Sequence, residues 1–76
     1  MVLKDFLDKF ASQFEETDAN SFTELTKFKD LEEWSSLMAL SIIAMTDEEY
    51  SVKIKGEDIR SSNTIEDLSN IVKSRI

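Results

Sequence analysis

The side chains that could do chemistry in this chain are carboxylates, lysines and hydroxyls, because its 76 residues include neither histidine nor cysteine. The commonest general base and the strongest nucleophile are therefore missing, and a Ser-His-Asp triad is excluded. Neighbouring carboxylates, such as Glu15 with Glu16 and Glu32 with Glu33, could act as acid and base, but in a small domain such pairs usually lie on solvated helix faces. We therefore expect no catalysis, and no metal site, because the ligand spacing of a calcium loop is missing.

Two adjacent hydroxyl groups, those of Ser35 and Ser36, stand at the start of a long run without glycine or proline. A hydroxyl at the start of a helix lies beside free backbone N–H groups and the positive end of the helix dipole, which favour an attached phosphate. The simpler role for either serine is to cap the helix. The residues alone favour capping over modification.

The elements that must position these serines are predicted to be helices. Apolar residues at intervals of three and four predict a first helix from Leu3 to about Glu16, a second from Leu37 to Tyr50 and a last one from Ile65 to about Arg75. A short helix is expected after Gly56, over Glu57 to Arg60. The predicted fold is all-α, a small four-helix bundle with three main helices, one short helix and a long loop between the first two.

The second predicted helix has two distinguishable sides. At about 100° per residue, one side is assigned to the core and carries Ala39, Ile42, Ile43, Thr46 and Tyr50. The other side carries Leu37, Ser41, Ala44 and Glu48.

The connections between the helices are also expected to be ordered. In the long connection an apolar residue recurs at every third position, at Phe22, Leu25, Phe28, Leu31 and Trp34. This spacing predicts a loop pinned to the core, with a helical turn over Ser21 to Lys27. Val52 and Ile54 indicate a buried connection, and Thr64 with Asp67 nearly forms a capping box before the last helix.

Composition limits the partners of the chain. Nine basic against sixteen acidic residues give a net charge of -7 and a pI near 4.4, which repels nucleic acids and anionic membranes and suits a basic protein partner. No apolar run approaches the roughly 20 residues that span a bilayer, and the first residues do not resemble a signal peptide. Without cysteine, the chain is expected to be cytoplasmic, and we expect a monomer with a single domain, residues 1–76.

The segment Trp34-Ser35-Ser36-Leu37 resembles the Asp-Ser-Leu signature of the acyl carrier protein family, in which the serine receives 4'-phosphopantetheine from coenzyme A. The similarity covers most of the chain without an obvious gap, through Phe28, Leu31, Ile43, Asp47, Glu48, Glu49, Tyr50, Ile54, Ile59, Thr64 and Ile65. In the family an aspartate precedes the modified serine, and here Ser35 holds its place. Ser35 can still cap the helix, but a carboxylate that would pair with a basic group of the modifying transferase is missing.

The resemblance implies a helical bundle of the acyl-carrier type, with Ser36 as the site of covalent phosphopantetheine attachment. The implied partners are a phosphopantetheinyl transferase and enzymes that load or process an acyl group carried as a thioester on the arm. The expected docking residues on the second helix are Leu37, Met38, Ser41, Ala44, Met45, Asp47 and Glu48. Longer acyl chains would lie among Ile43, Thr46, Ile54, Ile59 and Leu68, which could equally be ordinary core residues.

Two other functions remain open. The chain could be an aminoacyl or peptidyl carrier that serves a ligase, with the same fold and arm and a different cargo. It could also be an unmodified acidic helical module that binds one basic partner, and the missing aspartate favours this reading. The side of the second helix that carries Met38, Ser41, Ala44 and Met45 is less acidic than expected of a general fatty-acid carrier, so partners in a dedicated biosynthetic pathway are expected.

Overall fold

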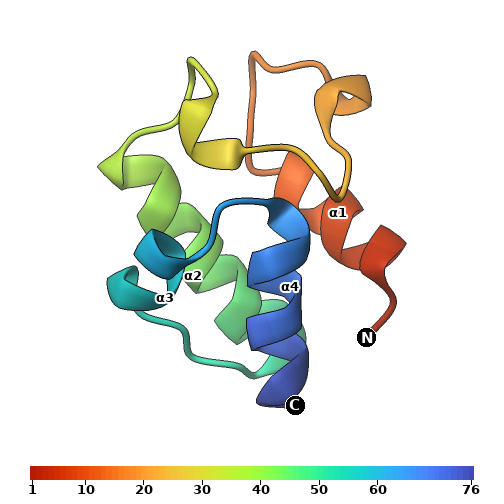
Figure 1. Ribbon diagram of the computed structural model, residues 1–76, viewed down its shortest axis with the longest axis vertical. Helices are drawn as coiled ribbons and strands as arrows, with labels where there is room; N and C mark the ends of the chain where they lie inside the picture. The colour runs from red at the N-terminus through yellow and green to blue at the C-terminus, as the bar shows by residue number, and fades with distance from the viewer.

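The computed structural model describes all 76 residues and contains helices but no strands, as the sequence predicts (Figure 1). The helices are α1 (Leu3–Ala11), α2 (Ser36–Tyr50), α3 (Gly56–Ser61) and α4 (Ile65–Ser74). Two 3₁₀ turns, at Ala19–Ser21 and Phe28–Asp30, lie in the long connection between α1 and α2. Helix α1 packs against α2 and α4, while the short α3 contacts α2 and α4. None of these helices combines the length and apolar character needed to cross a membrane.

Helix α1 ends at Ala11 rather than near Glu16, so the predicted end of this helix is wrong. The carboxylate of Glu33 explains the difference, because it accepts the backbone N–H groups of Glu15, Glu16 and Thr17 at 3.0, 3.2 and 2.9 Å. These N–H groups would otherwise donate to helix carbonyls one turn earlier. The carboxylate of a distant residue thus takes the place of the helix carbonyls, and the last turn of the predicted helix does not form.

The long connection crosses one end of the bundle as an ordered loop (Figure 1). Phe22 and Phe28 are buried in it as predicted, but Leu25 is 69% exposed. The helical turn predicted over Ser21 to Lys27 does not form, because the Thr26 hydroxyl accepts the Thr23 N–H at 2.8 Å and donates to the Ser21 carbonyl at 3.0 Å. These bonds hold the segment in a tight turn between the two 3₁₀ turns.

The first N–H groups of α4 are paired partly with this loop and partly with the helix's own N-terminal cap. The N–H groups of Ile65 and Glu66 donate to the carbonyls of Thr26 and Glu24 at 3.1 and 3.0 Å. The predicted capping box is present, since the Thr64 hydroxyl accepts the Asp67 N–H and the Asp67 carboxylate accepts the Thr64 N–H. Helix α4 therefore leaves few of its first N–H groups unpaired.

The hydrophobic core joins all these segments in one cluster of 13 buried residues. It is rich in aromatic rings, and Phe10 is its centre: the ring centroids of Phe14, Phe22 and Phe28 lie 5.6, 6.1 and 5.5 Å from that of Phe10. Val52 and Ile54 close the other side, which confirms the predicted buried connection. Packing of aromatic rings from α1 and the loop therefore holds the loop in place.

Candidate functional site

Ser35 and Ser36 occupy different positions at the start of α2. Ser35 is the N-cap residue, with extended backbone angles, and its hydroxyl accepts the N–H of Met38 at 3.2 Å. Ser36 is the first helical residue, its side chain is exposed, and its hydroxyl forms no hydrogen bond with the protein. The structure thereby assigns capping to Ser35, and the hydroxyl of Ser36 is left free.

The surroundings of the Ser36 hydroxyl favour negative charge. The backbone N–H groups of Ser36 and Leu37 have no acceptor within the protein, as expected for the first residues of a helix. They lie at the positive end of the dipole of a 15-residue helix. An anionic group attached to Ser36 would therefore lie beside unpaired N–H donors.

An open pocket of about 380 Å³ lies beside these serines, between the end of the long connection, α2 and α3. Its lining residues are Lys29, Trp34, Ser35, Ser36, Ala39, Gly56, Ile59 and Arg60. The pocket thus combines apolar surface with two basic side chains and the free Ser36 hydroxyl. The sequence pattern did not indicate this combination, because Lys29 and Arg60 come from segments about 30 positions apart.

The five predicted acyl-chain residues lie mostly in the closed core. Thr46, Ile54, Ile59 and Leu68 are buried and Ile43 is half-buried. Only Ile59 also lines the pocket beside Ser36, and the other four residues line no pocket. The structure therefore places Thr46, Ile54 and Leu68 in the closed interior and Ile43 against the core, and it shows no cavity among them.

The predicted docking residues of α2 divide into exposed and buried groups. Leu37, Ala44, Asp47 and Glu48 are exposed, and Ser41 is half-buried. The prediction that Met45 lies on the outer side is wrong, because Met45 is only 3% exposed and belongs to the core. Met38 is half-buried and packs against that core.

The error for Met45 has a simple cause. Apolar residues surround α2, so the sequence pattern alone does not decide which side faces inward. In the structure the buried side runs through Ile42, Met45 and Thr46, while Leu40 is 61% exposed and was not predicted as a docking residue. The exposed apolar surface of α2 therefore consists mainly of Leu37 and Leu40.

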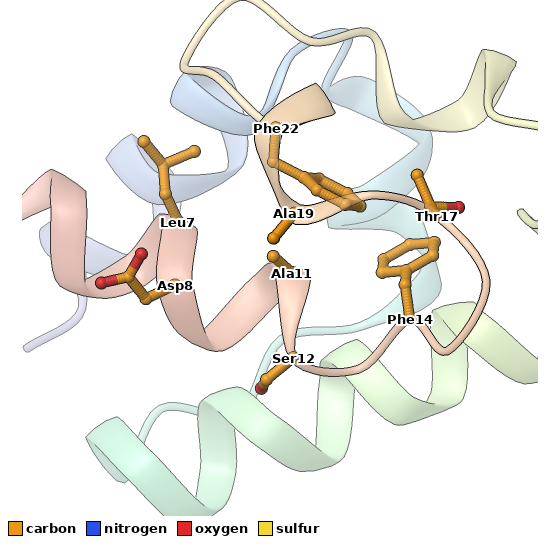
Figure 2. A pocket seen from close by; sticks show the side chains of 8 residues that line it. All are labelled: Leu7, Asp8, Ala11, Ser12, Phe14, Thr17, Ala19 and Phe22. Atoms are coloured by element: carbon orange, nitrogen blue, oxygen red, sulfur yellow. The ribbon is translucent and has the colours of Figure 1, made fainter.

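A second hollow, of about 350 Å³, lies at the end of α1 (Figure 2). Figure 2 shows its lining side chains, which are Leu7, Asp8, Ala11, Ser12, Phe14, Thr17, Ala19 and Phe22. The rings of Phe14 and Phe22, with centroids 5.0 Å apart, form one wall. Asp8 is the only charged side chain among the lining residues. The hollow forms where the chain turns away after Ala11, and it contains none of the predicted site residues.

The carboxyl groups with displaced pKa values all have structural hydrogen bonds. The Thr17 hydroxyl and the backbone N–H groups of residues 15–17 lower the pKa of Glu33, and Arg75 lowers that of Asp58 to about 2. The Tyr50 hydroxyl donates to Asp5 at 2.7 Å and lowers the pKa of that carboxyl group, as does Lys9. Burial and the Asp5 carboxylate raise the pKa of Tyr50. None of these groups lines the pocket beside Ser36.

Comparison with known proteins does not place the chain in a family: no protein-family model matches the sequence, and no curated protein matches it.

Proposed function

We propose that this chain is a carrier protein that holds an acyl group as a thioester on a 4'-phosphopantetheine arm attached to Ser36. The observation that carries the proposal is the exposed Ser36 hydroxyl, which forms no hydrogen bond while Ser35 caps the helix. This division of roles agrees with the resemblance of residues 34–37 to the acyl carrier signature. In this proposal the chain supplies position rather than catalysis, acting as a cytoplasmic monomer where coenzyme A is available.

The residues around Ser36 fit a covalent attachment carried out by another enzyme. Attachment forms a bond between Ser36 Oγ and the phosphorus that bears pantetheine in coenzyme A, and breaks the phosphoanhydride bond to release adenosine 3',5'-bisphosphate. The serine proton must pass to a base. No carboxylate lines the pocket beside Ser36, so we expect the transferase to supply that base.

The exposed side of α2 supports an enzyme partner with a mixed docking surface. Leu37 and Leu40 are 72% and 61% exposed, and the acidic Asp47 and Glu48 lie exposed further along the same helix. A partner with an apolar patch and basic residues next to it would match both features.

Mass spectrometry after co-expression with a broad-specificity phosphopantetheinyl transferase tests the proposal. The parent protein should gain the mass of one phosphopantetheine group, and peptide fragmentation should place the group on Ser36. Ser36→Ala should abolish the gain while the circular dichroism spectrum stays helical. The matched control, Ser35→Ala, should lose only a cap, at a cost of about 1 kcal/mol, and should keep the modification.

Ser35→Asp tests the departure from the family signature. Aspartate caps a helix as well as serine does, and its charge is favourable at the positive end of the dipole, so the fold should be kept. It also restores a carboxylate for a basic group of the transferase, so this variant should be modified faster than the parent. If neither form accepts the group, the carrier proposal is wrong and the unmodified interaction module is the better reading. If the group maps to Ser35, the assignment of Ser36 as the attachment site is wrong.

A further inference from the structure

The pocket beside Ser36 is basic in an acidic protein. The chain has a net charge of -7, yet the only charged residues that line this pocket are Lys29 and Arg60. Neither side chain forms an ion pair, a state that both share with Lys27, Lys53, Lys55 and Lys73. Because Lys29 and Arg60 line one pocket together and no carboxylate lines it, their charges indicate a place for an anion that the protein does not itself supply.

The two basic groups reach the pocket in different ways. Lys29, in the 3₁₀ turn Phe28–Asp30, donates from its ammonium to the carbonyl of Arg60 at 2.9 Å. This bond ties the long connection to α3 and leaves two ammonium hydrogens free. The guanidinium of Arg60 lies across Gly56, with Nη1 3.3 Å from where a Cβ on that residue would be, and it has no acceptor. The only glycine of the chain thus leaves room for a guanidinium that could bind an anion.

The rest of the pocket suits a chain attached to that anion. Trp34, Ala39 and Ile59 provide its apolar surface, and Trp34 is fixed by an edge-on contact with Phe28, at 5.0 Å between ring centroids. Ser36 lies at the border of the same pocket. A ligand attached to the Ser36 hydroxyl could therefore place a negative charge between the cations and an apolar portion against Trp34 and Ile59.

We propose, on the basis of the function proposed above, that Lys29 and Arg60 bind the phosphodiester that joins the arm to Ser36. A phosphodiester carries one negative charge at neutral pH, and hydrogen bonds from ammonium and guanidinium groups to phosphate oxygens are among the strongest in proteins. The arm then begins by lying along Trp34 and Ile59 toward α3 instead of extending freely from α2. Lys29 and Arg60 act as positioning residues for the arm.

Phosphorus NMR and thermal unfolding of the modified and unmodified protein test this assignment. In the modified parent, the phosphodiester resonance should shift away from its position in the same sample in denaturant. The melting temperature of the modified form should also exceed that of the unmodified form. In the double variant Lys29→Gln/Arg60→Gln, the phosphodiester resonance should move toward its position in denaturant. The difference in melting temperature between the modified and unmodified forms should shrink.

Two further variants control for charge and for folding. Lys73→Gln removes a positive charge in the last turn of α4, outside the pocket, and should leave both readings at the parent values. Arg60→Lys keeps the charge and should keep most of the phosphorus shift. Because Lys29 also contacts the Arg60 carbonyl, each variant is compared with its own unmodified form, so that a loss of stability common to both forms cancels.

The results separate this inference from the carrier proposal. If the parent gains no phosphopantetheine, both are wrong. If it gains the group on Ser36, but the phosphorus shift and the melting difference are the same in the parent and in the double variant, only the role of Lys29 and Arg60 is overturned.

Discussion

At the scale of single residues, the carboxylate of Glu33 determines the path of the chain after α1. It accepts three successive backbone N–H groups and also the Thr17 hydroxyl, at 2.7 Å. Backbone donors arranged around one anion form a small binding site for that anion, here filled by the protein itself. Glu32, its neighbour, is exposed and accepts none of these bonds.

Glu33→Gln should therefore destabilise the fold, and Glu32→Gln should not. A glutamine amide has only one oxygen, and its NH₂ group would oppose the N–H groups that now donate to the carboxylate. Urea unfolding should show a lower midpoint for Glu33→Gln than for the parent, while the Glu32 variant keeps the parent midpoint or rises slightly because net negative charge falls. Equal midpoints for the two variants would contradict the role assigned to Glu33.

The same carboxylate should make the stability of the protein depend on pH in the acid range. The pKa of Glu33 is lowered in the folded protein from its ordinary value of 4.5, chiefly by the Thr17 hydroxyl and the backbone N–H groups. The stability that ionised Glu33 contributes is therefore fully present above its ordinary pKa. It is lost as the pH falls through the lower pKa of Glu33 in the folded protein. Between about pH 6 and about pH 3, the parent should lose more stability than Glu33→Gln, which lacks the titrating group.

At the scale of elements, a serine lies at each end of α2, and the two serines have different roles. Ser35 caps the first turn, and Ser51 ends the helix in the left-handed conformation, with φ 56° and ψ 34°. The Ser51 N–H donates to the Asp47 carbonyl at 3.0 Å, which is the bond of an αL cap, and the Val52 N–H donates to the Thr46 carbonyl at 3.2 Å. This ending turns the chain so that Val52 and Ile54 enter the core.

Ser51→Gly should stabilise the protein by about 0.5–1 kcal/mol. A left-handed backbone conformation costs a residue with a Cβ about 1–2 kcal/mol. Glycine avoids that cost, but part of the gain is lost because glycine gives the unfolded chain more conformational freedom. Ser41→Gly is the matched control, because Ser41 lies inside α2, where glycine costs about 0.5–1 kcal/mol. Opposite shifts of the melting temperature are expected, and a fall for Ser51→Gly would contradict the strain assigned to this position.

The elements also show what could be predicted from the sequence. The cap of α2, the capping box at Thr64 and the buried Val52 and Ile54 depend on neighbouring residues, so local patterns were enough to predict them. The end of α1 depends on Glu33, which lies 16–18 residues from the N–H groups it accepts. No local pattern could reveal that bond.

The pocket beside Ser36 was missed for the same reason. The sequence indicated the serines, but Lys29 and Arg60 meet only because the long connection packs against α3. Met45 was misplaced because α2 is apolar on several sides, and packing against α1 and α3 decides which side is buried. Tertiary contacts, rather than residue types, determine these features.

At the scale of the whole molecule, the aromatic cluster couples the fold to the candidate site. Phe28 is fully buried, with its ring 5.5 Å from Phe10 of α1 and 5.0 Å from Trp34, measured between centroids. Trp34 immediately precedes Ser35 and lines the pocket beside Ser36. The position of the serines therefore depends on packing that begins in α1.

Phe28→Ala should cost about 3–5 kcal/mol, the range for truncating a buried phenylalanine. A protein of 76 residues has a total stability of about 4–11 kcal/mol, so this variant should be largely unfolded or melt far below the parent. The matched control is Leu25→Ala, an apolar truncation in the same connection at a side chain that is 69% exposed, and it should change stability by less than about 0.5 kcal/mol. Urea unfolding followed by Trp34 fluorescence reports both effects, because the indole contacts the Phe28 ring directly. If Phe28→Ala unfolds at the same urea concentration as Leu25→Ala, the aromatic cluster does not hold the connection, and the placement of Ser36 needs another explanation.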